Sequence, residues 1–509
     1  MKKTIQKASA LVGLSGLILM SSSTVVEYQS LSAILVSSLA LMFFGGVIFF
    51  WNQYSNTLAG IKNNGVFFNT LTNRGLLGLI LGVLITFIYV LIYWYPKTLG
   101  YNSSGPSTGL ISLFDPLSYL LNGKPASRWF VYGSLYTFAI VLFGIKFIYK
   151  YRNNRYQVIR TVSVMFFQFA FAYYIPEILS ALNPDTPYFA KDLKNIWPLN
   201  YYFFDQWHLK NMLYGGGLGM FFLVFGLVLV FIISPILTYF YGKRWYCSWV
   251  CGCGGLAETA GDAFRQLSSK KLNVWKIERL MIHAVLVFIF ITTIAVIWSF
   301  LGRNPDLYIN RKGFFYIITF ITLTTIGVIY FTKKNGFSKD LRATVVSLGV
   351  ILISLIAIRA YSNETHILFI ESAKLQKSYG FFIGAAFSGV LGVGFYPILG
   401  SRVWCRFGCP AAAILGIQQR LFSRFRITTN GGQCISCGNC SVYCEMGIDV
   451  RSYAQRGENI VRSSCVGCGI CAAVCPRGVL KLENDKLKNR IPSFEFPLGN
   501  NPDITNTIN

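Results

Sequence analysis

Eight of the thirteen cysteines lie in two closely spaced runs near the C-terminus. These runs are Cys434-x2-Cys437-x2-Cys440-x3-Cys444 and Cys465-x2-Cys468-x2-Cys471-x3-Cys475, the second followed by Pro476. Three thiolates at this spacing can wrap three corners of an iron–sulfur cubane, and a helical turn carries the fourth away to the other cluster. The spacing therefore predicts one [4Fe–4S] cluster bound by Cys434, Cys437, Cys440 and Cys475, and a second bound by Cys465, Cys468, Cys471 and Cys444.

Structural zinc and disulfides are the two ordinary alternatives for so many cysteines. Zinc sites use four ligands, typically as two separated pairs, and not two runs of four with a terminal Cys-Pro. Basic flanking residues place this region in the cytoplasm, where thiols stay reduced. The eight cysteines are thus predicted to be ligands of clusters that pass single electrons.

A second cysteine pattern occurs twice, each time directly after an apolar segment. The first copy is Gly242-Lys-Arg-Trp-Tyr-Cys247-x3-Cys251, and the second is Gly400-Ser-Arg-Val-Trp-Cys405-x3-Cys409, followed by Pro410. The matching register of Gly, Arg and Cys indicates an internal repeat, which membrane proteins commonly use to build a site between two halves. Positions i and i+4 share one face of a helix, so each pair is expected to present its two thiols together.

These two pairs are expected to meet, so that Cys247, Cys251, Cys405 and Cys409 hold a third iron–sulfur centre at the membrane surface. The sequence leaves two alternatives open, namely a transient copper or redox dithiol site and ordinary small, buried cysteines. Cys253 follows the first pair in the order Cys251-Gly252-Cys253 and is predicted to be an additional or alternative ligand.

The composition of the 509-residue chain is that of a membrane protein. Hydrophobic residues make up 53% and charged residues 13%, against about 25% charged residues in an average soluble protein. Ten apolar blocks approach the ~20 residues that a helix needs to cross a bilayer. The blocks are approximately 8–26, 31–51, 75–96, 129–149, 161–182, 214–240, 280–301, 313–332, 343–360 and 380–400. The first block could be a signal peptide, but its length favours an uncleaved span.

Most lysines and arginines lie between these blocks and give the chain a formal net charge of +26. The positive-inside rule then places both termini on the cytoplasmic side of a bacterial cytoplasmic (inner) membrane. This topology accounts for the charge, and the sequence contains no nucleic-acid-binding motif, so no nucleic acid is expected as a partner. Glycines within 215–219 and 384–394 are expected to allow close packing of helices in lipid.

The expected fold class is mostly α, with about ten membrane spans followed by an α+β bacterial two-cluster ferredoxin domain. Two cytoplasmic segments, each with a cysteine pair and a basic amphipathic stretch along the inner interface, follow the sixth and the tenth span. The predicted units are 1–241 (six spans), 242–279 (first cysteine motif), 280–400 (four spans), 401–427 (second cysteine motif), 428–485 (ferredoxin domain) and 486–509 (tail).

The combination of a polytopic membrane region, paired G-x-R-x-[WY]-C-x3-C motifs and two four-cysteine runs resembles the NapH/NosR/CcoG family of polytopic membrane ferredoxins. The resemblance covers residues 242–253 and 400–480. Two departures from this family stand out: Cys253 follows the first pair where a Cys-Pro is usual, and no extracytoplasmic flavin domain or S-G-A-T-type flavin attachment sequence is recognised. Within the ferredoxin domain, Glu445 stands where bacterial two-cluster ferredoxins usually have a proline after the first run.

The resemblance implies an electron-transfer protein that relays single electrons between the quinone pool or a cytoplasmic donor and a respiratory partner, as in quinol dehydrogenase-like subunits. A redox assembly factor that reduces copper or thiols for a membrane metalloenzyme is the alternative. The expected partners are the lipid membrane, an electron donor or acceptor protein such as ferredoxin, flavodoxin or a respiratory subunit, and quinone. No catalytic residue is assigned from the sequence.

Overall fold

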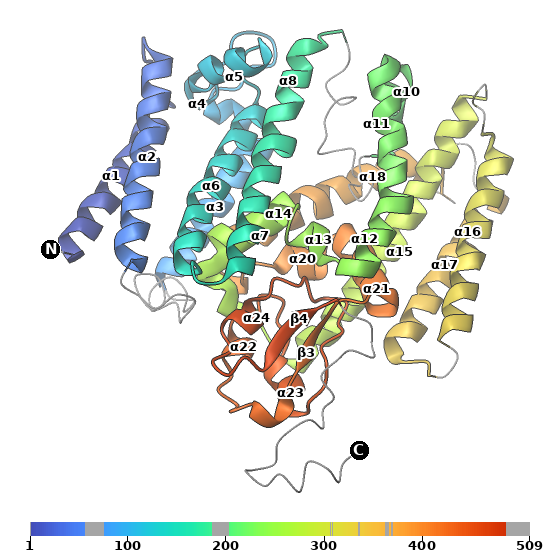
Figure 1. The fold of residues 1–509 in the computed structure, drawn as a ribbon. Helices are drawn as coiled ribbons and strands as arrows, with labels where there is room; N and C mark the ends of the chain where they lie inside the picture. The colour runs from blue at the N-terminus through green and yellow to red at the C-terminus, as the bar shows by residue number, and fades with distance from the viewer. Residues whose placement is uncertain are drawn as a thin grey trace, which may run out of the picture.

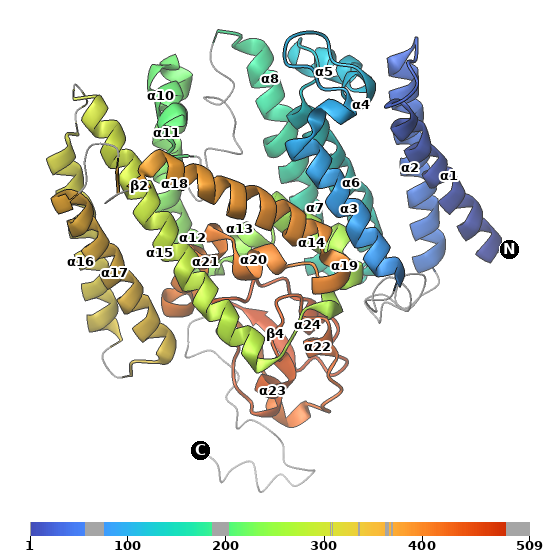
Figure 2. The same ribbon diagram turned by 180° about the vertical axis from the view of Figure 1, so that it is seen from behind.

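The computed structural model describes residues 2–55, 76–185, 203–305, 307, 309–333, 336–361, 366–367 and 370–484. A bundle of long helices occupies most of the molecule, and a small C-terminal domain (residues 426–484) packs against one end of it (Figures 1 and 2). The predicted tail 486–509 lies outside the described residues.

Eight helical segments in the described part of the chain are long and apolar enough to cross a membrane. Six are single α-helices: α1 (Lys2–Ser22), α2 (Leu31–Tyr54), α6 (Arg128–Lys150), α15 (Leu272–Arg303), α16 (Arg311–Thr332) and α17 (Lys339–Tyr361). Two contain a π-helical stretch: α7–η2–α8 (Arg155–Phe166, Phe167–Tyr174, Ile175–Leu182) and α11–η4–α12 (Gly216–Val228, Leu229–Ile233, Ser234–Tyr241). These eight correspond to eight of the ten predicted apolar blocks.

The remaining two blocks also form helices. One is α3 (Leu76–Trp94), which is shorter than the others in its strictly apolar part. The other is α18 (Ser372–Tyr379), which continues as the π-helix η6 (Gly380–Gly394) and then α19 (Tyr396–Leu399). Close packing explains the glycines of η6, because a Cβ at Gly389 would lie 3.0 Å from the ring of Tyr89 in α3. In the cluster 215–219, a Cβ at Gly219 would lie against the carbonyl oxygen of Met212, as expected for close packing. A Cβ at Gly216 or Gly217 would meet no atom within 4 Å, so the expectation was wrong at these two positions.

The end of the bundle opposite the C-terminal domain carries short elements (Figure 1). They are η1 (Pro96–Leu99), α4 (Gly109–Leu113), α5 (Asp115–Asn122) and α10 (Gln206–Tyr214). A two-stranded hairpin of β1 (His366–Ile367) and β2 (Ile370–Glu371) precedes α18. An apolar core of α4, α5 and the ends of α1, α2 and α6 holds this end together.

The C-terminal domain is built around an antiparallel pair of strands, β3 (Arg426–Thr429) and β4 (Leu480–Glu483). Between them lie a short helical turn, η7 (Gly431–Gln433), and three short helices, α22 (Asn439–Val442), α23 (Val450–Gln455) and α24 (Ile470–Ala473). The pairing of Arg426 with Glu483 and of Thr429 with Leu480 joins the two ends of the domain. This small α+β unit follows a mostly helical membrane region, as the sequence predicts.

Five short elements connect the spans to the C-terminal domain. They are α13 (Arg244–Cys247), α14 (Gly252–Thr259), η5 (Ala260–Leu267), α20 (Val403–Phe407) and α21 (Pro410–Phe422). Both views place α13, α14 and α20 between the spanning helices and the C-terminal domain. The amphipathic segments were expected to lie along the lipid interface, but η5 and α21 are instead largely buried within the protein.

Candidate metal centres

The first predicted ligand set comes together around a cavity in the C-terminal domain, lined by Cys434, Cys437, Cys440 and Cys475. Burial and then the neighbouring thiols of the other three cysteines raise the pKa of the Cys440 thiol to about 11. Cys475 therefore lies with the first run and not with its own, which is the exchange of fourth ligands that the spacing predicts.

The second set is assembled in the same way, with Cys444 contributed by the first run. Desolvation raises the pKa of Cys471 well above its usual range, and the charges of Cys468, Cys465 and Cys444 raise it further. Cys465 and Cys471 are buried, whereas Cys437 of the first set is exposed. The second set is therefore the inner one.

The two runs repeat each other in backbone conformation as well as in sequence. Gly438 and Gly469, each one residue after the second cysteine, have φ angles of 78° and 75° and directly precede helices α22 and α24. A left-handed residue here turns the chain so that the third cysteine points back toward the first two. Ser436, with a φ angle of 56°, takes the place of Gly467 in the first run.

The two repeated cysteine pairs also meet, at the junction between the spans and the C-terminal domain. The thiol of Cys409 has its pKa raised by desolvation and then by the neighbouring thiols of Cys405, Cys247 and Cys251. We call these four residues the CxxxC centre. Gly242 and Gly400 end the preceding helices with φ angles of 66° and 95°, so both copies of the repeat enter the site through the same turn.

The expectation that each pair shares one face of a single helix was wrong. In both copies the chain turns between the two cysteines, and the second cysteine is the N-cap of the next helix, Cys251 for α14 and Cys409 for α21. The backbone N–H of Ala412 donates to the sulfur of Cys409 over 3.5 Å. A thiol at a helix N-terminus faces free N–H groups and the positive end of the helix dipole, which favour a thiolate.

Each of the three cysteine sets suits a metal centre by the chemistry of its donors. Thiols that crowd together in a desolvated site oppose one another's ionisation, as the raised pKa values of Cys440, Cys471 and Cys409 show. Iron supplies the positive charge that allows such a set to be thiolate together. The sulfurs would then be bound by the clusters, with backbone N–H groups directed at them.

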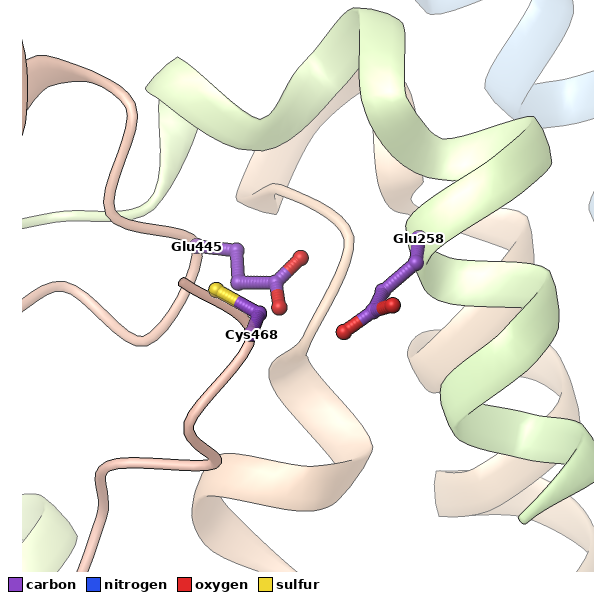
Figure 3. A group of neighbouring side chains, drawn as sticks. All are labelled: Glu258, Glu445 and Cys468. Atoms are coloured by element: carbon purple, nitrogen blue, oxygen red, sulfur yellow. The ribbon is translucent and has the colours of Figure 1, made fainter. Parts of the chain in front are cut away.

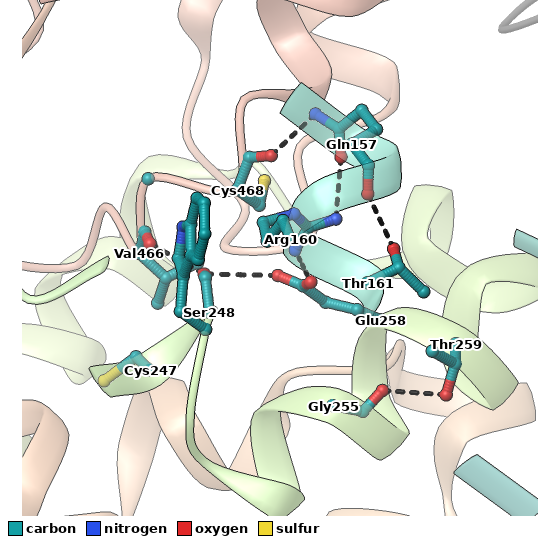
Figure 4. Close-up of polar contacts among 12 residues, drawn as sticks. Gln157, Arg160, Thr161, Cys247, Ser248, Gly255, Glu258, Thr259, Val466 and Cys468 are labelled. Carbon is teal, nitrogen blue, oxygen red and sulfur yellow. Dashed lines mark hydrogen bonds and ion pairs between the residues drawn. The ribbon is translucent and has the colours of Figure 1, made fainter. Parts of the chain in front are cut away.

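Hydrogen bonds join every residue in the loop of the second set, residues 465–468, to the membrane region. Four consecutive carbonyl oxygens accept hydrogen bonds of 2.8 Å: Cys465 from Gln419, Val466 from Ser248, Gly467 from Tyr156 and Cys468 from Gln157. Figure 4 shows two of these contacts, at Val466 and Cys468. The second set thus faces the membrane region, and the first set faces away from it.

Comparisons with known proteins agree with this geometry. The family described as "4Fe-4S dicluster domain" matches residues 433–480, and the family described as "4Fe-4S binding domain" matches residues 222–274 and again 380–428. The chain is a ferredoxin-type iron–sulfur protein of the membrane. The two matches of the second family coincide with the two copies of the cysteine repeat.

One curated relative adds to this picture. YccM of Escherichia coli (strain K12), a protein named for electron transport, is 24% identical over 238 residues. The alignment covers 45% of this chain and 48% of the relative, so the chain spans about half the length of the curated relative that it matches. No solved structure matches the chain.

A network of buried charges lies between the second set and the spans of this membrane ferredoxin. Arg160 of α7, Arg265 of η5 and Arg402 before α20 are all fully buried. Glu258 of α14 pairs with Arg160 and Arg402, and Glu445 pairs with Arg402 at 3.1 Å and with Arg265 at 3.3 Å. Burial opposes ionisation of Glu445, but Arg402, Arg265 and Arg160 outweigh it and lower the pKa of its carboxyl group.

Glu258, Glu445 and Cys468 lie within 4.8 Å of one another by their ligand atoms and could by distance alone hold a metal ion (Figure 3). The surrounding guanidinium groups argue for a different interpretation. Both carboxylates already have cationic partners, and Figure 4 shows Arg160 beside Glu258 and Cys468. An additional cation there would be repelled by the three arginines. We interpret this group as an ion-pair network.

These charged residues are not predicted by the sequence to be part of the site. Glu445 was recognised only as a departure from the usual proline, and Arg402 only as part of the repeat. Their partners in α7, α14 and η5 are far away in the chain, so no local pattern connects them. The signal for a buried charged site was weak: Glu258, Asp262 and Arg265 are charged residues in a segment whose other residues are mostly small or apolar.

Proposed function

We propose that the chain relays single electrons from a soluble donor, through two [4Fe–4S] clusters and a third iron–sulfur centre, to a quinone or a respiratory partner in a bacterial cytoplasmic membrane. The first cluster would be held by Cys434, Cys437, Cys440 and Cys475, and the second by Cys465, Cys468, Cys471 and Cys444. The third would be held by the CxxxC centre, with Cys253 as an additional or alternative ligand. The soluble donor would be a ferredoxin or flavodoxin on the cytoplasmic side.

The placement of the two ferredoxin sets carries this proposal. The four hydrogen bonds to loop 465–468 hold the second set against the membrane region, while Cys437 of the first set is exposed. An electron from solution would enter at the first cluster and leave toward the CxxxC centre. A domain whose clusters served only its own stability would not need this directional arrangement.

Iron analysis of single-cysteine variants tests the third centre. Cys251→Ser and Cys405→Ser should lower the iron-to-protein ratio of anaerobically purified protein, while the signals of the two ferredoxin clusters persist. Cys253→Ser distinguishes an essential ligand from an accessory one, because only loss of an essential ligand should lower the ratio. An unchanged iron content in both Cys251→Ser and Cys405→Ser would exclude the third centre.

Electron entry is tested by reducing the purified protein with either candidate donor and recording EPR spectra. Reduced ferredoxin or flavodoxin should reduce the first cluster fastest, and a quinol should reduce the chain only through the membrane region. If neither donor reduced any cluster, the relay would be wrong.

Reduction of copper or thiols for the assembly of another membrane protein is the second candidate function. One observation favours it: the thiol of Cys253 lies within hydrogen-bonding distance of Cys251, which gives a close pair of thiols beside the CxxxC centre. Such a pair could form a disulfide or bind copper. Copper bound in place of iron, and lost in Cys251→Ser and Cys253→Ser alike, would support this function.

A further inference from the structure

A single arginine lies between the CxxxC centre and the second ferredoxin set. The guanidinium of Arg402 donates to the sulfur of Cys405 over 3.6 Å and to the carbonyl oxygen of Cys247 over 3.3 Å. Its other side meets Glu445, with Nε 3.1 Å from the carboxylate, and Glu258, with Nη2 2.5 Å away. Arg402 therefore contacts both halves of the CxxxC centre and the C-terminal domain at the same time.

Glu445 completes the connection on the side of the C-terminal domain. It follows Cys444 directly in the chain, and its carboxylate lies within 4.8 Å of the sulfur of Cys468. Figure 3 shows its side chain directed past Cys468 toward Glu258. The contacts thus run without interruption from Cys405 through Arg402 and Glu445 to Cys468.

The charges along this connection are arranged to act on the second cluster. Three buried guanidinium groups, those of Arg160, Arg265 and Arg402, face the carboxylates of Glu258 and Glu445 beside Cys468, and Arg265 also pairs with Asp262. The side chains of Arg402 and Glu445 are completely shielded from solvent. Charges in a site of low dielectric act more strongly than exposed ones, and the net charge near a cluster is among the factors that set its reduction potential.

We propose that Arg402 and Glu445 are a pair of positioning residues. They hold the second cluster at a fixed distance from the CxxxC centre, and they set the reduction potentials of the second cluster and of the CxxxC centre. The proposal rests on the proposed function, since it takes the two cysteine sets to be iron–sulfur centres. In the transfer step one electron leaves the reduced second cluster and enters the oxidised CxxxC centre. No bond forms or breaks, and the arginine and glutamate keep their protons.

Because Arg402 and Glu445 carry opposite charges, neutralising one or the other should shift the midpoint potential of the second cluster in opposite directions. Arg402→Gln removes a positive charge beside the second cluster, so reduction becomes less favourable and its midpoint potential should fall. Glu445→Gln removes a negative charge at the same place, so the potential should rise. Arg402→Lys keeps the charge and should keep the potential close to the wild-type value.

The measurement is an EPR-monitored redox titration of the full chain in detergent, under anaerobic conditions. The first cluster is an internal control, because none of its cysteines contacts the pair. Asp340→Asn is the control, since it removes a carboxylate that pairs with Arg279 at 2.9 Å and is about one-third exposed. It should leave the potential of the second cluster unchanged.

Shifts in the same direction for Arg402→Gln and Glu445→Gln, or no shift in either with both clusters present, would overturn the proposal. If Arg402→Gln fails to fold, Glu445→Gln and Arg402→Lys carry the same test. Failure of the proposed function is recognised separately, because Cys405→Ser would then leave the iron content unchanged. The titration of the second cluster does not depend on that result.

Discussion

The charge of Asp262 depends on its neighbours at the junction between the spans and the C-terminal domain. Its carboxylate lies 2.7 Å from Lys150, 3.1 Å from Arg265 and 3.9 Å from Lys146, all without solvent exposure. Burial alone would raise the pKa of Asp262, but these three cations together lower it to about 2. The aspartate is therefore an anion that neutralises a group of buried cations.

Asp262→Asn should consequently destabilise the protein by about 3–5 kcal/mol, because it leaves buried cations uncompensated. Asp340→Asn is the matched control, since Asp340 pairs with Arg279 at 2.9 Å but is about one-third exposed. Exposed pairs contribute about 0–1 kcal/mol, so the control should change little. Thermal unfolding in detergent measures both, and equal losses of stability would contradict the argument.

The exchange of ligands between the two runs makes a second prediction at the residue scale. Cys475→Ser should impair the first cluster, although Cys475 belongs to the second run, because its sulfur lies with those of Cys434, Cys437 and Cys440. Cys444→Ser should impair the second cluster instead. EPR spectra of the two variants should therefore lose different signals, and loss of the same signal would show that the ligands are not exchanged.

At the scale of elements, α21 is the surface on which the C-terminal domain rests. Gln419 donates to the carbonyl oxygens of Arg462 and Cys465, each at 2.8 Å. One turn earlier, Gly416 lies against the backbone of Ser463, where an added Cβ would be 2.5 Å from the carbonyl oxygen. The close approach of this helix to the domain therefore requires the absence of a side chain at position 416.

Gly416→Ala should separate the two surfaces and cost about 1–3 kcal/mol, the usual effect of overpacking. Gly327→Ala in α16 is the control, because a Cβ there would meet no atom within 4 Å. Alanine also favours a helix over glycine by about 1 kcal/mol, so the control should be neutral or stabilising. Limited proteolysis of the C-terminal domain and thermal unfolding would report the difference, and similar behaviour of the two variants would contradict it.

The sequence predicts these elements where a local pattern specifies them. The spans follow from runs of apolar residues, and the two ferredoxin sets from the spacing of their cysteines. The pairing of the two CxxxC copies was predicted from their repeat, but their placement on single helices was wrong, since a turn separates Cys247 from Cys251. The role of Glu445 could not be predicted, because Arg265 and Arg402 come near it only after the chain has folded.

At the scale of the whole molecule, the first cysteine set, which is the outer of the two ferredoxin sets, lies beside basic residues. The cavity of the first set is lined by Arg451 and Arg477 as well as by its cysteines, and both arginines are exposed. The chain as a whole has a net charge of +26. An acidic soluble donor would be attracted to this face, with a rate that falls as salt screens the charges.

Arg451→Glu combined with Arg477→Glu should therefore slow reduction by a ferredoxin or flavodoxin and weaken the dependence of the rate on salt. Lys374→Glu is the control, because this exposed lysine belongs to α18, a helix that lies apart from the C-terminal domain (Figure 2). Stopped-flow reduction at several ionic strengths measures the effect. A rate independent of salt in the unaltered protein would indicate a donor carried in the lipid.

The hydrogen bonds that hold loop 465–468 to the helices also impose an order on biogenesis. Cys465 and Cys471 are buried, and the carbonyl oxygens of residues 465–468 are occupied by Gln419, Ser248, Tyr156 and Gln157. A scaffold protein that delivers a preformed cluster needs access to those sulfurs. On the proposed function, delivery of the second cluster would therefore precede the final docking of the domain, and maturation would end with the closure of a junction whose cluster is already in place.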